Sequence, residues 1–167
     1  MQASPVSAAS TASPVAIVQE LLNDPTNPEV VNRLTTPDVT YVSLNYKNED
    51  LRKLMPWCGT YTGPQAIIDT FLRVYRYWEK HDIRVDTIFG DGEHVAVFGR
   101  MDYRSTMLGK TVVSPMAIYA RVNDGKITYL QYMEDTFGTG ATFHSSGVAK
   151  FHSDPNGGEV EVGPTAA

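Results

Sequence analysis

The chain has 167 residues and a formal net charge of −5, from 14 Lys and Arg against 19 Asp and Glu. A length of this order favours a single domain whose core needs no disulfide or metal. The acidic balance lacks the electrostatic footprint of a nucleic-acid-binding protein. The lone cysteine excludes an internal disulfide, and apolar runs of at most five residues are too short to span a membrane. These features predict a cytoplasmic protein with no nucleic-acid or membrane partner.

The domain is expected over residues 14–143, between a flexible leader (1–13) and a Gly-, Ser- and Pro-rich tail (144–167). Two short helices open it, because Ser13-Pro14 and Asn27-Pro28 each place an N-cap residue before a proline in the first turn. A strand rich in β-branched and aromatic residues is expected at 39–44. In the tail, the alternation at 159–162 is compatible with a short edge strand.

The longest expected helix starts in the segment Thr62-Gly63-Pro64-Gln65, either through a capping box or with Gly63 as the N-cap. Its apolar side chains recur at helical spacing up to about Lys80. They are Ile67, Ile68, Phe71, Leu72, Val74, Tyr75 and Trp78.

Four strands are expected after this helix, at 83–89, 95–103, 111–122 and 126–134. Glycine-containing turns separate them, and no crossover helix intervenes, so these strands should form an antiparallel meander. Helices and strands that are segregated along the chain predict an α+β fold, with a curved sheet wrapped around the long helix.

Several short segments resemble the SnoaL-like polyketide cyclase and ketosteroid-isomerase-related group of the nuclear-transport-factor-2-like superfamily. They include residues 57–63, the long helix, residues 92–99, Gly109-Lys110 and residues 124–136, so that the resemblance covers about 14–143. It implies a cone-shaped fold that encloses a deep apolar pocket. It also implies a homodimer formed through the outer face of the sheet.

The strand at 95–103 offers two opposite faces, and the sequence supports two readings of them. Alternation alone predicts that the odd-numbered residues from Val95 to Tyr103 face the core, while the even-numbered residues from Ala96 to Arg104 face solvent. The resemblance to the limonene-epoxide-hydrolase branch implies the reverse, because an Arg-x-Asp in that strand faces the cavity. We therefore expect Arg100 and Asp102 in the cavity, and the odd-numbered residues on the dimer surface.

A guanidinium beside a carboxylate keeps the acid ionised and oriented, which suits a general base. Alternation in the last strand places Tyr132 and Glu134 on one face, and Tyr41 lies in the first strand. The candidate catalytic residues are Asp102, Arg100, Glu134, Tyr132 and Tyr41.

The resemblance also argues against two of the family's reactions. Tyr132 stands where the epoxide hydrolases carry a second aspartate, and the segment after the first strand, Leu44–Asn48, has no acid where the ketosteroid isomerases need a base. Cyclase-type proton transfer needs only one carboxylate in an apolar pocket, which this sequence can supply.

A small, mostly apolar ligand is expected in the cone. Its expected contacts are Trp57, Tyr61, Phe71, Tyr75, Phe98, Met116, Ile118, Leu130 and Asn45. The sequence has no phosphate loop, no dinucleotide fingerprint and no metal-ligand spacing, so we expect neither a cofactor nor a metal.

Three kinds of function remain open at this point. The first is a cofactor-independent acid/base enzyme of isomerase, cyclase or hydrolase type, acting on a carbonyl-bearing or cyclic molecule. The second is a non-catalytic ligand-binding or carrier domain with the same pocket. The third is a protein-interaction module that uses the sheet face or the mouth of the cone.

Overall fold

A computed structural model describes residues 12–164 of the chain, so most of the expected leader lies outside the described residues. The helices are α1 (Pro14–Asn23), α2 (Pro28–Leu34), α3 (Glu49–Leu54), α4 (Pro64–Tyr77) and α5 (Thr136–Ala141). The strands are β1 (Thr35–Ser43), β2 (Gly59–Thr62), β3 (Trp78–Asp91), β4 (His94–Ser105), β5 (Thr111–Asn123), β6 (Lys126–Glu134), β7 (Ala149–Phe151) and β8 (Val160–Val162). None of the helices in this part of the chain is long and apolar enough to cross a membrane.

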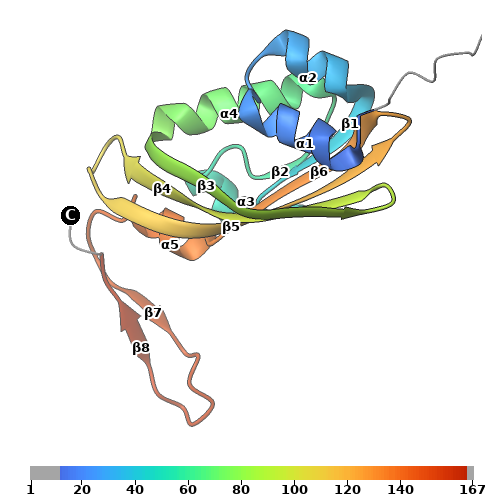
Figure 1. The fold of residues 1–167 in the computed structure, drawn as a ribbon. Helices are drawn as coiled ribbons and strands as arrows, with labels where there is room; N and C mark the ends of the chain where they lie inside the picture. Colours follow the sequence, from blue (N-terminus) through green and yellow to red (C-terminus); the bar gives the residue numbers. More distant parts are fainter. Residues whose placement is uncertain (1–11, 165–167) are drawn as a thin grey trace, which may run out of the picture.

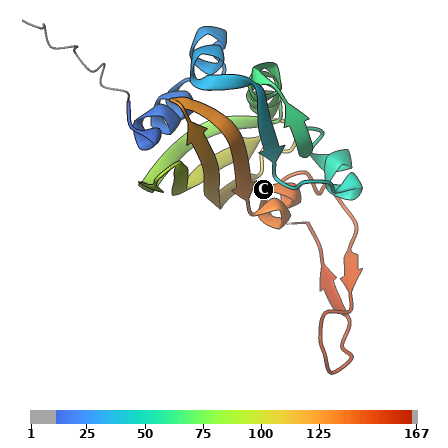
Figure 2. The ribbon, with the colours of Figure 1, turned by 90° about the vertical axis from the view of Figure 1, so that its right-hand side faces the viewer.

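Six strands form one curved sheet in the order β2-β1-β6-β5-β4-β3. Helices α1, α2 and α4 lie on its concave side, as the two ribbon views show (Figures 1 and 2). The expected α+β cone, with an antiparallel meander wrapped around the long helix, is therefore confirmed. One pair departs from the antiparallel pattern, because β1 runs parallel to β6.

The long helix ends earlier than its apolar spacing predicts. Trp78 has left the helical conformation (φ −130°, ψ 137°) and opens β3 instead. Its ring is buried against Trp57 and Tyr103, with ring centroids 5.2 and 5.8 Å apart. Trp78, which ends the apolar helical pattern, therefore belongs to β3 and to the hydrophobic core.

Gly99 in β4 lies at a bulge that bends the sheet. It pairs with Val85, and the register of β3 then shifts by one residue before Thr87 pairs with Phe98. A Cβ atom at position 99 would lie 2.2 Å from the Arg84 carbonyl oxygen. Only glycine allows the two backbones to approach this closely.

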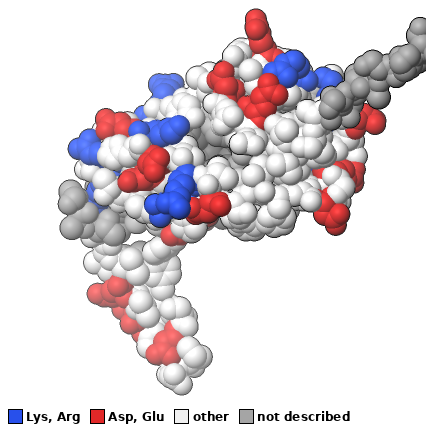
Figure 3. All heavy atoms as spheres, in the orientation of Figure 1, with Lys and Arg blue, Asp and Glu red and all other residues white. Residues whose placement is uncertain are grey.

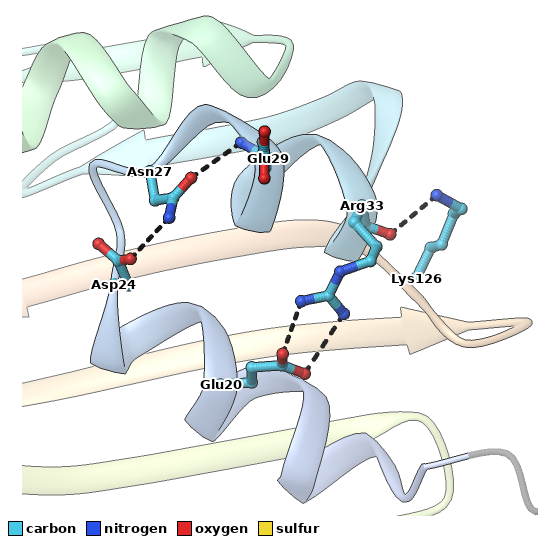
Figure 4. Close-up of polar contacts among 6 residues, drawn as sticks. All are labelled: Glu20, Asp24, Asn27, Glu29, Arg33 and Lys126. Carbon is cyan, nitrogen blue, oxygen red and sulfur yellow. Dashed lines mark hydrogen bonds and ion pairs between the residues drawn. The ribbon is translucent and has the colours of Figure 1, made fainter.

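The corner between α1 and α2 is held by polar contacts that Figure 4 shows. Arg33 of α2 donates to both carboxylate oxygens of Glu20 of α1, at 2.6 and 3.5 Å. Lys126, at the start of β6, donates to the Arg33 carbonyl oxygen at 3.0 Å, and Asn27 caps α2 through the Glu29 amide. The Arg33–Glu20 pair joins α2 to α1, and the Lys126 bond joins α2 to β6.

The tail forms a hairpin that stands away from the body (Figures 1 and 2). Strand β8 pairs antiparallel with β7 and not with the main sheet. In Figure 3, acidic side chains mark this arm, while other charges gather near the helices and at the ends of the sheet, leaving a wide uncharged stretch between them.

Candidate functional site

A cavity of about 340 Å³ opens between the helices and the inner face of the sheet. One wall comes from α1 and α4, and the other from the inward-facing residues of β3, β4, β5 and β6. The lining residues are Gln19, Leu22, Asn23, Pro25, Phe71, Tyr75, Lys80, Ile83, Val85, Ile88, Val97, Tyr103, Met116, Ile118 and Tyr132.

A narrower recess of about 20 Å³ lies beside this cavity. Phe71, Tyr103 and Tyr132 line both spaces, so the recess and the cavity are neighbours. The other residues of the recess are Tyr41, Ser43, Leu44, Trp57, Thr70, Val74, Trp78 and Glu134. The recess thus places hydroxyl groups and one carboxyl group next to a cavity of mixed lining, in which Gln19, Asn23 and Lys80 lie among apolar side chains.

Glu134 is the only acidic residue that lines either space within the described part of the chain. It ends β6, is partly buried, and its Oε1 atom accepts a hydrogen bond from the Thr139 hydroxyl at 3.0 Å. Burial raises the pKa of Glu134 to about 7, with a smaller contribution in the same direction from Asp135 and an opposing one from the Thr139 hydrogen bond. A carboxyl group in this condition exchanges its proton near neutral pH.

Three tyrosine hydroxyls surround this carboxyl group. The Tyr132 hydroxyl donates to the Met101 sulfur at 3.1 Å and approaches the Met116 sulfur at 3.7 Å. Thioether sulfur is a weak acceptor, so a ligand oxygen can readily take its place. Burial raises the pKa values of Tyr132, Tyr41 and Tyr103, so that all three phenols remain hydrogen-bond donors at neutral pH.

Eight of the residues expected from the sequence line the recess or the cavity. They are Glu134, Tyr132, Tyr41, Trp57, Phe71, Tyr75, Met116 and Ile118. The long helix contributes Phe71 and Tyr75 because its apolar stripe turns toward the sheet. Strands β1, β5 and β6 contribute most of the others.

The expectation that the even-numbered residues of β4 face the cavity is wrong. Val95, Val97, Met101 and Tyr103 are the buried ones, and Val97 and Tyr103 line the cavity. The odd-numbered side chains of β4 are the apolar ones, and they become buried because they pack against α1 and α4. Simple alternation therefore predicts this strand correctly, and the epoxide-hydrolase pattern does not.

Arg100, Asp102 and Phe98 consequently lie on the outer face. Arg100 and Phe98 are exposed, and the Asp102 side chain is 40% exposed, 3.9 Å from His81 Nδ1. The ring of Phe98 stacks on Phe89, with centroids 6.2 Å apart. None of the three expected residues touches the cavity, so the structure gives Asp102 no enclosed ligand to act on.

Three other expected pocket residues also lie outside the lining. Leu130 is buried in the core, and the Tyr61 hydroxyl donates to the Cys58 carbonyl oxygen at 3.2 Å. Asn45 is exposed in the loop after β1, where its side chain accepts from the Lys47 amide. Residues 12–164 contain no cluster of three His, Cys, Asp or Glu side chains that could hold a metal ion.

Several lining residues were not expected to contact a ligand. Tyr103 follows from the alternation of β4, and Ser43 from the alternation of β1 two residues after Tyr41. No sequence pattern indicated Thr139, whose hydroxyl contacts Glu134, because its helix Thr136–Ala141 is short and contains two glycines.

Comparison with known proteins identifies the family. The family model described as a SnoaL-like domain matches residues 20–130. Patulin synthesis protein F of Aspergillus clavatus is 46% identical over 152 residues, covering 87% of this chain and 77% of that protein. Patulin biosynthesis cluster protein F of Penicillium expansum is 43% identical over 156 residues, covering 90% and 78%.

Solved structures share the fold. An NTF2-like protein from Burkholderia thailandensis superposes with a TM-score of 0.68 at 21% identity, covering 80% of this chain and 99% of that one. TerC, co-crystallised with polyporic acid, gives a TM-score of 0.63 at 21% identity, covering 76% and 95%. The chain belongs to the SnoaL-like domain family, and it shares its fold with NTF2-like proteins.

Proposed function

We propose that this protein is a cofactor-independent enzyme that moves a proton on a small, mostly apolar, carbonyl-bearing or cyclic molecule. The observation that carries the proposal is Glu134, a single carboxyl group with a pKa of about 7 in a small recess beside the larger cavity. A general acid/base works best when its pKa lies near the working pH. Glu134 meets this condition because of burial.

In the proposed reaction the Glu134 carboxylate takes a proton from a carbon beside the substrate carbonyl. The electron pair of that C–H bond moves toward the carbonyl oxygen, which becomes an enolate. Tyr132, which has only thioether partners, donates a hydrogen bond to this oxygen. Protonated Glu134 then returns the proton to another atom of the same molecule, so atoms and charge balance without a co-reactant.

The relatives support the choice of a small metabolite as substrate. Two proteins that are 46% and 43% identical to this chain are named for the synthesis of patulin. From these names we propose only that this chain also acts in the synthesis of a small natural product. The volume of about 340 Å³ is compatible with a molecule of that kind.

A direct test follows proton exchange in D₂O by NMR, with a panel of small cyclic ketones and lactones. The wild-type protein should replace the acidic C–H hydrogen of a bound compound by deuterium. Glu134→Gln should slow this exchange at least ~100-fold, the usual contribution of a general base. Asp102→Asn, a carboxylate of the outer face, is the matched control and should exchange at the wild-type rate. Full exchange by Glu134→Gln would refute the assignment.

A non-catalytic ligand-binding domain is the second candidate. It is favoured by the fact that the lining residues, all of them in the described part of the chain, include one carboxyl group and no second one. For this function, compounds would bind and shift their NMR signals while no deuterium enters them, in the wild-type protein as well as in the variants.

We also propose that the protein forms a homodimer through the outer face of the sheet. Phe89, Phe98 and Val113 are 55%, 47% and 64% exposed there, and two of these rings stack on each other. Exposed apolar clusters of this kind are typical of association surfaces. Phe98→Asp should convert a dimer to a monomer in analytical ultracentrifugation, and a wild-type monomer would rule the proposal out.

A further inference from the structure

Thr139 lies next to Glu134, the candidate acid, in helix α5. It is fully buried, and its Oγ1 atom is 3.0 Å from Glu134 Oε1 and 2.9 Å from the Asp135 carbonyl oxygen. A threonine hydroxyl has one proton to donate, but it can also accept. It can therefore donate to only one of these two oxygens at a time.

The segment around Thr139 is held on both sides. Before it, the Asp135 amide donates to the buried Ser114 hydroxyl at 3.1 Å. After it, the Thr142 hydroxyl donates to the Thr139 carbonyl oxygen at 2.7 Å and accepts from the Trp78 indole nitrogen at 3.0 Å. The backbone on both sides of Thr139 is thus held by hydrogen bonds to buried hydroxyl groups.

We propose that Thr139 is a positioning residue that supports Glu134 in both of its protonation states by exchanging its own hydrogen-bond partner. This inference rests on the proposed function of Glu134 as an acid/base. When Glu134 is ionised, the Thr139 hydroxyl donates to its Oε1 atom. When Glu134 is protonated, its O–H donates to Thr139 Oγ1, and the Thr139 hydroxyl donates to the Asp135 carbonyl oxygen.

The backbone makes this exchange possible without loss. The Asp135 carbonyl oxygen also accepts from the Thr139 amide at 3.0 Å, so it keeps a partner whichever way the hydroxyl points. An unpaired buried polar group costs roughly 1–3 kcal/mol. Because neither state leaves one, Glu134 can take up and return a proton without that penalty.

The other groups around Glu134 do not compete for this role. Tyr41, Tyr103 and Tyr132 come from β1, β4 and β6. Burial raises the pKa values of all three phenols, so they stay neutral. The carboxylate of Asp135 is occupied by the amides at the start of α5, at 3.0 and 3.1 Å.

The test needs no substrate, only a pH titration of protein labelled with ¹³C at the glutamate side-chain carboxyl. The Glu134 signal is assigned by its absence in Glu134→Gln. Thr139→Val should raise the titration midpoint by roughly half a unit to one unit, because a charge-assisted hydrogen bond is lost from the ionised state and a weaker neutral one from the protonated state. Thr139→Ser keeps the hydroxyl and should titrate near the wild-type midpoint.

Thr142→Val is the matched control, because it removes a buried hydroxyl from the same segment without touching Glu134. It should lower the melting temperature and shift the midpoint less than Thr139→Val does. Infrared difference spectra provide the second readout, since the C=O band of protonated Glu134 should move in Thr139→Val, whose valine offers no acceptor.

The proposal is overturned if Thr139→Val titrates like the wild type, or if Thr142→Val shifts the midpoint as far. It is also overturned if the infrared band stays in place. Failure of the proposed function is a separate result, since Glu134→Gln would then retain proton exchange while the titration of Thr139→Val still shifted.

Discussion

The two faces of the sheet carry similar side chains in different surroundings. Glu134 on the inner face lines the recess beside the cavity and has a pKa of about 7. Asp102 on the outer face is 40% exposed and has a histidine 3.9 Å away. An acidic residue in the sequence is thus only a potential base, and enclosure decides which carboxylate can act as one.

The largest difference in stability between a buried and an exposed position should come from substituting methionine. Met101 is buried under Tyr132, whereas Met107 in the β4–β5 loop is 84% exposed. Met101→Ala should lower the free energy of unfolding by about 2–5 kcal/mol through cavity formation. Met107→Ala should change it by less than about 0.5 kcal/mol. Urea denaturation measures both, and equal losses would contradict the assignment of the faces.

The next effect is a dependence of stability on pH that belongs to Glu134. Its pKa of about 7 lies above the ~4.3 of an exposed glutamate, so the folded chain binds more protons than the unfolded chain between these values. The free energy of unfolding should therefore fall as the pH rises from about 4 to 7, by at most about 3 kcal/mol.

Glu134→Gln removes this dependence. At pH 8 the variant should unfold at a higher temperature than the wild type, and the two should converge near pH 4. Asp102→Asn serves as the control and should follow the wild-type pH profile. A Glu134→Gln variant that is less stable than wild type at pH 8 would show that burial does not strain this carboxyl group.

The smallest effect concerns a single phenol hydroxyl. Tyr132→Phe should slow proton exchange on a bound compound by about tenfold, the equivalent of one net hydrogen bond. Tyr119→Phe removes a hydroxyl that contacts His94 at 2.7 Å outside the cavity and should leave the rate unchanged. Stopped-flow or NMR rates measure the pair, and equal rates in Tyr132→Phe and wild type would exclude a hydrogen bond to the reacting oxygen.

Local patterns in the sequence predict most of the fold. The helical spacing from Ile67 to Tyr75 and the turn at Asp124-Gly125 each act within a few residues, and the structure confirms both. The parallel pairing of β1 with β6 joins segments far apart in the chain and leaves no local trace. The hairpin of β7 and β8 likewise depends on pairing across an eight-residue gap rich in polar residues.

The candidate site is predictable only in part, for a related reason. Glu134 and Tyr132 share a face by simple alternation, and the structure places both in the recess. Arg100 and Asp102 were assigned to the cavity by family resemblance, against the alternation of their own strand. Burial of Val97 and Met101 outweighs that resemblance, because hydrophobic packing decides which row faces the helices.

A substitution at the Gly99 bulge is one way in which the cavity can be lost. Any side chain there would push the Arg84 backbone outward, and the Met116 methyl group is only 3.0 Å from the missing Cβ atom. A substitution would push β3 away from β4 at this point and displace Met116, which lines the cavity. The room available to a guest molecule therefore depends on one position that never touches it, and a single larger residue there could disable the protein while every reactive group stayed intact.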